Sequence, residues 1–152
     1  MNETQSSPST PTARRKARRF ALQALYQWQL AGAALSDIEV HFLTVNDMKK
    51  VDRNYFHDLL HGVPARLTEI DEALTPLLDR KVEELSQVEK VILRIGAFEL
   101  LARQDVPWRV VINEGIELAK VFGADDSFKY VNGVLDKLSR DARQAEREQT
   151  QR

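Results

Sequence analysis

The sequence predicts an all-α fold on three observations. Apolar residues recur at steps of three and four along most of the chain, which is the spacing of one helix face. Residues that favour helix starts and stops border these apolar runs. No segment alternates apolar and polar residues as a half-buried strand does, and the 6 Gly and 5 Pro residues are few for a turn-rich β fold. We therefore expect the 152 residues to form one helical domain.

The first expected helix covers residues 12–31 and follows a polar tail, residues 1–11, that we expect to be disordered. Thr12 is its expected N-cap, and Gly32 its expected end, because glycine readily adopts the left-handed conformation that closes a helix. One face of this helix is apolar. The opposite face combines arginines with Tyr26, which fits a basic, partly aromatic contact surface. The alternative is that Tyr26 packs on a second layer of the same protein.

The next helices are predicted by a capping pattern and a long apolar stripe. Ser36 and Glu39 have the spacing of a capping box, in which each side chain bonds the other residue's backbone N–H, and a short helix to about Val45 follows. The apolar stripe from residue 56 to residue 77 keeps its phase through Pro64. We therefore expect one long helix that bends at this proline.

Two further helices are expected after residue 86. Ser86 and Glu89 form a second capping-box pattern before a helix that is apolar on most sides, which indicates a central position. Pro107 is the expected first residue of the following helix. Gly115 lies at the centre of that helix's apolar face, where the missing side chain allows another helix to approach closely.

The last core helix is expected to start after Asp125 or Asp126, one of which caps it. Its inward face is apolar as far as Leu138, so the helical domain covers residues 12–139. Residues 140–152 are charged and have no apolar face, and we expect them to form an exposed C-terminal tail that either frays or extends the helix into solvent.

The composition excludes several classes of protein. Hydrophobic residues make up 43% of the chain and charged residues 30%, which is enough apolar content for a core. The absence of cysteine excludes disulfide scaffolds, thiol nucleophiles and thiolate metal sites. No apolar run reaches the roughly 20 residues of a membrane span, and the polar N-terminus lacks the apolar core of a signal peptide. We therefore expect a cytoplasmic protein without membrane contact.

The net charge of −1 hides an uneven distribution. Residues 1–20 contain five basic residues and one acidic residue, so they carry +4 and the rest of the chain carries −5. The five cations, which lie between Arg14 and Arg19, attract phosphates through counterion release, and Tyr26 offers a ring for stacking on an unpaired base. These features predict nucleic-acid binding without distinguishing RNA from DNA. The alternative is an ordinary solvated helix face.

His57 and His61 have the only metal-like spacing in the sequence. Two histidines at i and i+4 on a helix can share a zinc ion, and here Asp58 stands between them. Both lie off the apolar stripe, and nothing marks His41 as a third ligand. We therefore expect an exposed pair without a metal. Because no phosphate loop or nucleophile elbow occurs either, we expect no catalytic residues, no cofactor and no enzymatic activity.

Six segments resemble the NusB family of bacterial transcription antitermination factors. Each segment alone is a weak signal, but together they follow the family's order. The likeness extends from Arg14 to Leu138. The segments are Ala17–Trp28, Phe56–Gly62, Gln87–Gly96, Asp105–Glu114, Ile116–Gly123 and Lys129–Asp136.

The resemblance implies two small helical bundles packed across one another, residues 12–80 and residues 86–139. It also implies a function. Proteins of this family bind the boxA element of ribosomal RNA leader transcripts together with NusE, a protein of the small ribosomal subunit. With other Nus factors they join RNA polymerase and suppress premature termination in rRNA operons. The resemblance implies no catalysis and no cofactor.

Residue by residue, the resemblance implies two groups of RNA contacts. Long cations supply phosphate affinity in the first, and the N–H groups of a helix N-terminus are available in the second. Asp126 either accepts from a base amino group or caps its helix. The first group is Arg14, Arg15, Lys16 and Arg18, and the second is Asp126, Ser127, Lys129 and Tyr130.

Glu83 and Glu89 match positions where the family meets NusE, and Tyr26 matches a contact position. The acidic body of the chain suits a basic ribosomal protein. The alternative role for Glu89 is its capping box. Two other functions remain open, namely an RNA-binding domain related to the N-terminal part of an rRNA methyltransferase and a protein-only adaptor. The oligomeric state is also open.

Overall fold

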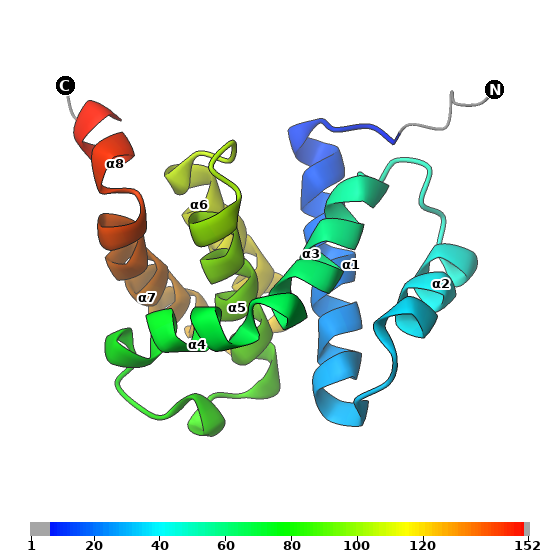
Figure 1. Ribbon diagram of the computed structural model, residues 1–152, viewed down its shortest axis with the longest axis horizontal. Helices are drawn as coiled ribbons and strands as arrows, with labels where there is room; N and C mark the ends of the chain where they lie inside the picture. The colour runs from blue at the N-terminus through cyan, green and yellow to red at the C-terminus, as the bar shows by residue number, and fades with distance from the viewer. Residues whose placement is uncertain (1–6, 151–152) are drawn as a thin grey trace. The chain divides into compact units, whose positions relative to one another are not determined.

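The computed structural model describes residues 7–150, and every regular element in that range is a helix (Figure 1). The all-α prediction is therefore confirmed. No helix in this range combines the length and the apolar character of a membrane-spanning segment. Residues 1–6 of the expected disordered tail lie outside the described residues. The helices are α1 (Pro11–Ala31), α2 (Leu35–Val45), α3 (Arg53–Ala65), α4 (Leu67–Leu74), α5 (Gln87–Ala102), α6 (Trp108–Phe122), α7 (Ser127–Ala142) and α8 (Gln144–Thr150), with short 3₁₀ helices η2 (Thr75–Leu77) and η3 (Val82–Glu84).

The chain divides into two compact units, residues 1–64 and residues 65–152. The first unit contains α1, α2 and nearly all of α3, and the second contains the other helices. The division falls earlier than the expected one after residue 80, because α4 packs on α5. Arg94 of α5, which is buried, donates two hydrogen bonds of 3.0 and 2.8 Å to the carboxylate of Asp71 in α4.

The N-terminus of α1 starts earlier than the sequence suggests. Thr10, not Thr12, is the N-cap, and its Oγ1 accepts the backbone N–H of the third helical residue at 3.1 Å. Pro11 is the first helical residue, a position where its missing N–H costs nothing. At the other end Gly32 adopts the left-handed conformation with φ of 66°, as expected for a glycine that closes a helix.

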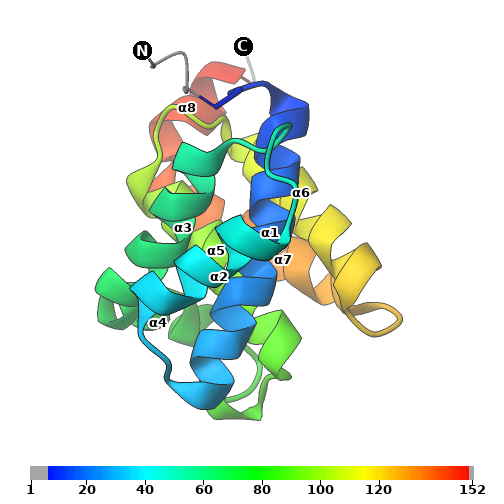
Figure 2. The ribbon, with the colours of Figure 1, turned by 90° about the vertical axis from the view of Figure 1, so that its right-hand side faces the viewer.

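Three phenylalanine rings join the helices of the first unit. Phe42 of α2 lies between Phe20 of α1, at a centroid distance of 6.5 Å, and Phe56 of α3, at 6.1 Å. Figure 2 shows α2 against α1, and the two helices are in contact. Phe56 is completely buried, and so are Leu59 and Leu60 of the same helix. The apolar stripe predicted for this region therefore forms the core.

The expected capping box at the start of α2 does not form. The helix begins after Ala34, with no side chain capping it, and Ser36 lies inside the helix. The carboxylate of Glu39 instead contacts the rings of His57 and His61 in α3. Tertiary partners for Glu39 have replaced the local bond that the sequence pattern predicts.

The single long helix expected from residue 56 to residue 77 is two helices. Arg66, with φ of −113° and ψ of 21°, separates α3 from α4. Pro64 lies in the last turn of α3 and has no N–H to continue the hydrogen-bond ladder. The stripe keeps its phase across the break, since Ile70 and Leu74 of α4 are buried. The regular spacing of apolar residues alone therefore does not distinguish one bent helix from two consecutive helices.

Helix α5 is the buried centre that its all-round apolar pattern predicts, and all its residues from 91 to 100 are buried. Leu135 of α7 packs against two glycines of the second unit. A Cβ atom added at Gly96 of α5 would lie 2.8 Å from both δ carbons of Leu135, and one added at Gly115 of α6 would lie 2.8 Å from its Cδ1. The expectation that Gly115 allows close approach is confirmed, and Gly96 is its counterpart on α5.

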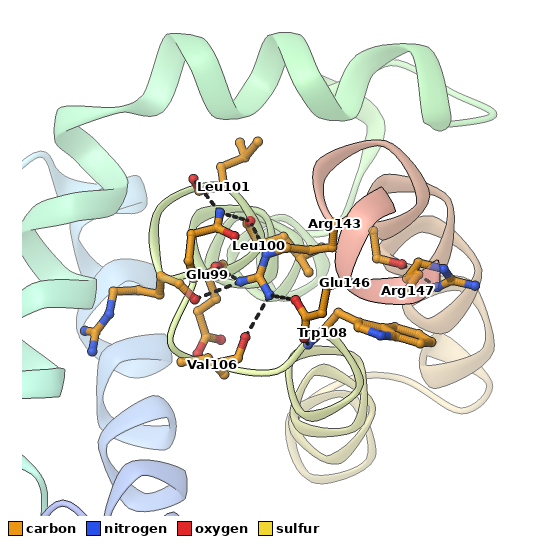
Figure 3. A network of polar contacts seen from close by, with 11 residues as sticks. Glu99, Leu100, Leu101, Val106, Trp108, Arg143, Glu146 and Arg147 are labelled. Carbon is orange, nitrogen blue, oxygen red and sulfur yellow. Dashed lines mark hydrogen bonds and ion pairs between the residues drawn. The ribbon is translucent and has the colours of Figure 1, made fainter. Parts of the chain in front are cut away.

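The segment after residue 139 continues as helix and is mostly exposed as far as the structure describes it, but it is not exposed throughout. Helix α7 continues to Ala142, and α8 follows as a further short helix. Arg143, between them, is 2% exposed and donates to four backbone carbonyls and one carboxylate (Figure 3). The carbonyl partners belong to the C-terminal part of α5 and the loop after it. They are Glu99 at 2.9 Å, Leu100 at 2.8 Å, Arg103 at 2.7 Å and Val106 at 2.9 Å.

Glu146 of α8 connects Arg143 to the start of α6. Its Oε1 accepts from Arg143 at 2.6 Å, and its Oε2 accepts the backbone N–H of Trp108 at 3.1 Å. The guanidinium of Arg147 lies 3.9 Å from the centroid of the Trp108 ring. The first N–H groups of a helix have no partner within the helix, so a carboxylate there stabilises α6.

Replacing Gly96 with Ala is expected to lower the free energy of unfolding by about 1–3 kcal/mol, because Leu135 cannot move away without meeting Gly115. The matched control is Gly133→Ala in α7, since nothing lies within 4 Å of a Cβ added at Gly133. This control is expected to be neutral or to stabilise by up to about 1 kcal/mol through helix propensity. Chemical denaturation measures both variants, and equal effects would contradict the packing argument.

Replacing Arg143 with Met is expected to destabilise the protein by at least about 3 kcal/mol, because several buried carbonyls lose their donor together. Arg140→Met is the control, since the Arg140 side chain is 65% exposed and forms an ion pair of 2.8 Å with Asp136 on the same helix. A surface pair of this kind contributes about 0–1 kcal/mol. Thermal unfolding followed by circular dichroism measures the difference. Similar melting temperatures for the two variants would show that the hydrogen bonds of Arg143 contribute little to stability.

Candidate nucleic-acid interface

The basic arm at the start of α1 divides into covered and exposed cations. Arg15 is exposed and Lys16 is half-buried. Arg14 lies with its guanidinium 4.6 Å from the ring centroid of Tyr55 and its Nε 3.5 Å from the carboxylate of Asp52. Arg18 is 2% exposed, with its guanidinium 5.2 Å from the same ring. The burial of Arg18 argues against the direct RNA contact that the resemblance implies for it.

Asp52 organises this end of the first unit and was not singled out from the sequence. It is buried, and one carboxylate oxygen accepts the backbone N–H of Tyr55 at 3.0 Å, as an N-cap side chain does. Its own N–H donates to the carbonyl of Ala13 in α1 at 3.2 Å, and Ser7 donates to its carboxylate at 3.4 Å. Its position one residue before α3 was the available sequence signal. Asp52 therefore fixes the start of α1 against the start of α3.

The second candidate group surrounds the N-terminus of α7. Asp126 is exposed and has φ of 69°, the only positive φ of a non-glycine among the described residues. Its side chain does not cap α7, so that alternative is not realised, and its carboxylate lies 3.5 Å from the Nζ of Lys129. Lys129 is 69% exposed in its side chain. Aspartate adopts this left-handed conformation more readily than most residues with a Cβ, and here it turns the chain into the start of α7.

Ser127 and Glu89, which the resemblance assigns to different partners, contact each other. Ser127 is buried and its hydroxyl donates to the Glu89 carboxylate at 3.0 Å. The expected capping box of Ser86 and Glu89 forms in one direction, with the Glu89 N–H donating to the Ser86 hydroxyl at 3.1 Å. The side chain of Glu89 uses its bonding capacity on α7 instead. This bond joins the N-termini of α5 and α7.

Tyr130 is fixed by two residues that the sequence did not indicate. Its hydroxyl donates to Asp79 at 3.1 Å, and the guanidinium of Arg80 lies 4.7 Å from its ring centroid. Arg80 also donates to Asp79 at 2.7 Å. Partial burial and the hydrogen bond to Asp79 raise the pKa of Tyr130, and the hydrogen bonds from Arg80 and Tyr130 lower the pKa of Asp79. An Asp-Arg pair in a loop carries no positional signal, so only the fold reveals it.

The remaining predicted contact residues lie on the surface or near it. Glu83 is exposed in η3, and Tyr26 is half-buried in α1. Within the second unit the structure thus pairs Glu89 with Ser127 and Asp79 with Tyr130, and the basic arm belongs to the first unit.

The histidine pair has a third candidate ligand, which is Glu39 of α2 rather than Asp58. The Glu39 carboxylate lies within hydrogen-bond distance of both rings, at 2.7 Å from the Nδ1 of His57 and 2.8 Å from the Nε2 of His61. Partial burial opposes the ionisation of Glu39. The two histidine contacts outweigh it, so its pKa is lowered.

Comparison with known proteins assigns the family. The model of the NusB family matches residues 15–140. The chain is 77% identical over 141 residues to the transcription antitermination protein NusB of Alcanivorax borkumensis, covering 93% of this chain and 94% of that protein. The chain belongs to the NusB family. NusB proteins are non-enzymatic antitermination factors, which agrees with the expectation of no enzymatic activity.

Two solved NusB structures share the fold. That of T. maritima NusB is similar with a TM-score of 0.75 and 31% identity, over 89% of this chain and 96% of that one. A chain from a crystal structure of the antitermination factors NusB and NusE in complex with double-stranded RNA is similar with a TM-score of 0.71 and 26% identity, over 86% of this chain and 98% of that one. The recognition of a NusB fold from sequence segments is thus confirmed.

Replacing Asp79 with Asn is expected to lower the pKa of Tyr130, because the carboxylate that favours the protonated phenol is removed while Arg80 stays. In the unaltered protein the raised pKa of Tyr130 gives stability that is present below its unfolded value and is lost as the pH rises through the folded value. Phenolate absorbance across an alkaline titration, with Tyr130→Phe subtracted, isolates this residue. An unchanged titration in Asp79→Asn would contradict the assignment.

Proposed function

We propose that this chain binds single-stranded boxA RNA of ribosomal RNA leader transcripts together with NusE. In this role it supports processive transcription of rRNA operons, in a complex with RNA polymerase and other Nus factors in the cytoplasm. The observation that carries the proposal of RNA and NusE binding is the similarity to a chain from the structure of NusB and NusE in complex with double-stranded RNA, since the similarity covers most of both chains.

The basic arm supplies the phosphate affinity in this proposal. Arg15 and Lys16 present cations from the first turns of α1, and Arg14 keeps part of its side chain accessible. Arg18 takes a supporting role, because its guanidinium lies beside Tyr55 and its side chain is buried. Phosphate contacts of this kind give affinity and position rather than sequence preference.

The N-terminus of α7 supplies the base contacts. Asp126 presents a carboxylate that is not used for capping, and Lys129 presents an exposed ammonium beside it. An acceptor and a donor on one helix end can read the edge of an unpaired base. Ser127 and Tyr130 hold this end in place through Glu89 and Asp79, so we assign them to positioning the contact groups.

NusE is the proposed protein partner of the acidic part of the chain. Glu83 is exposed and Glu89 is partly exposed, and carboxylates of this kind complement a basic ribosomal protein. Tyr26 is the proposed aromatic contact. The similarity to the antitermination protein of A. borkumensis along 94% of that protein favours this function over an rRNA methyltransferase domain.

The test compares RNA binding by the unaltered chain and two double variants, as the salt concentration is varied. Arg15→Ala with Lys16→Ala is expected to weaken binding and to reduce the logarithmic salt slope by about 0.7 for each phosphate that the arm no longer binds. Lys49→Ala with Lys50→Ala removes an equal charge from exposed positions in the loop before α3 and is the matched control. If both double variants show the same dependence of RNA binding on salt, the basic arm does not contact the RNA phosphates.

The RNA in this test is boxA, a scrambled strand of equal composition, and a duplex that contains boxA, each with NusE added stepwise. Tighter binding of single-stranded boxA, strengthened by NusE, is the expected result. Equal binding of the scrambled strand would overturn boxA recognition, and preference for the duplex would overturn single-strand binding. Binding of NusE without any RNA affinity would instead identify a protein-only adaptor.

A further inference from the structure

Three side chains of the first unit bring metal-binding atoms together. Glu39 comes from α2, and His57 and His61 come from consecutive turns of α3. The two carboxylate oxygens are divided between the rings, with Oε2 at 2.7 Å from Nδ1 of His57 and Oε1 at 2.8 Å from Nε2 of His61. The two ring centroids are 4.3 Å apart, and one ligand atom from each residue lies within 4.8 Å of the others. This convergence joins segments 18 and 22 residues apart in sequence.

The surroundings of the cluster suit an open metal site. The side chain of Glu39 is 16% exposed and that of His61 is 33% exposed, whereas that of His57 is 58% exposed. Two of the candidate ligands are thus partly buried, and the third borders solvent. A cation can enter from the side of His57 and keep water in its remaining coordination positions.

The donor set favours one class of cation. Imidazole nitrogens suit zinc, copper and nickel, whereas magnesium and calcium prefer sites made of oxygen ligands alone. Ligands bound at about 2.0–2.1 Å in a tetrahedral site lie roughly 3.3 Å from one another. The two hydrogen-bonded oxygen–nitrogen distances of 2.7 and 2.8 Å are therefore about half an ångström shorter than the spacing of ligands around a bound cation, a difference that side-chain rotation at the exposed ring can supply.

We propose that Glu39, His57 and His61 bind one divalent cation of the zinc, nickel and copper class, which fastens α2 to α3. The cation takes the place of the two hydrogen bonds that now join the carboxylate to the rings. It ties together the two helices that also share the contact between Phe42 and Phe56. The site lies within the first unit and shares no residue with the proposed RNA and NusE contacts.

The test is calorimetric titration of the full-length chain, free of any affinity tag and of chelator, with zinc chloride at neutral pH. One zinc ion per chain is the expected result. His61→Gln and Glu39→Gln are each expected to weaken zinc binding at least tenfold, because each removes one of three protein ligands while keeping a side chain of similar polarity. The melting temperature of the unaltered chain is expected to rise with zinc and to stay constant with magnesium.

His41→Gln is the matched control, since His41 is an exposed histidine of α2 that is not part of the cluster. It is expected to keep the zinc affinity and the zinc-dependent rise in melting temperature. The proposal is overturned if the unaltered chain binds zinc no better than His57→Gln with His61→Gln, or if His41→Gln loses as much affinity as His61→Gln. Circular dichroism in chelator verifies that each variant is folded before zinc is added. Strong visible absorbance of bound cobalt, measured as a second signal, is expected for a four-coordinate site and is expected to be lost in His57→Gln with His61→Gln.

Discussion

The close packing of Leu135 against Gly96 and Gly115 is the constraint on which the second unit depends. One leucine side chain occupies the space that two missing side chains leave, so α7 lies nearer to α5 and α6 than larger residues would allow. The position of α7 then determines both of its ends. Its N-terminus places Ser127 beside Glu89, and its C-terminus places Arg143 beside the carbonyls of the last part of α5 and of the loop after it. The candidate contact residues thus depend on apolar packing several turns away from them.

In the first unit, a buried carboxylate has the corresponding role. Asp52 receives an N–H from α3, places its own N–H on α1, and lies beside the guanidinium of Arg14. Tyr55 lies next to both Arg14 and Arg18. The basic arm is therefore not a set of equivalent surface cations. Arg18 is buried inside the first unit, whereas Arg15 is exposed to solvent.

The sequence predicted those features that rest on apolar spacing and on backbone geometry. The central position of α5, the close approach at Gly115 and the end of α1 at Gly32 follow from local rules. What it could not predict are polar residues whose partners lie far along the chain. Arg143 has the same appearance in the sequence as its exposed neighbour Arg140, and only the fold shows that it is buried.

The candidate site likewise combines residues that the sequence indicates with distant polar partners that it does not. The resemblance supplied the residues of the α7 start, but Asp79 and Arg80, which hold Tyr130, carry no sequence signal. The capping-box pattern at Ser36 predicted a cap that does not form, and the one at Ser86 predicted only half of the bonding, since Glu39 and Glu89 each direct their carboxylates to another helix. A pattern that predicts a bond within one turn cannot register a better partner that the fold brings near.

The hydrogen bonds from Arg143 to earlier carbonyls also affect the order in which the chain folds during its synthesis. The carbonyls it binds precede it by 37 to 44 residues, so they leave the ribosome well before their donor does. At ordinary translation rates this interval is about 2–9 seconds, during which the C-terminal part of α5 has to rely on water for its hydrogen bonds. The hydrogen bonds that join α5 and the loop after it to Arg143 therefore form only after residue 143 has left the ribosome.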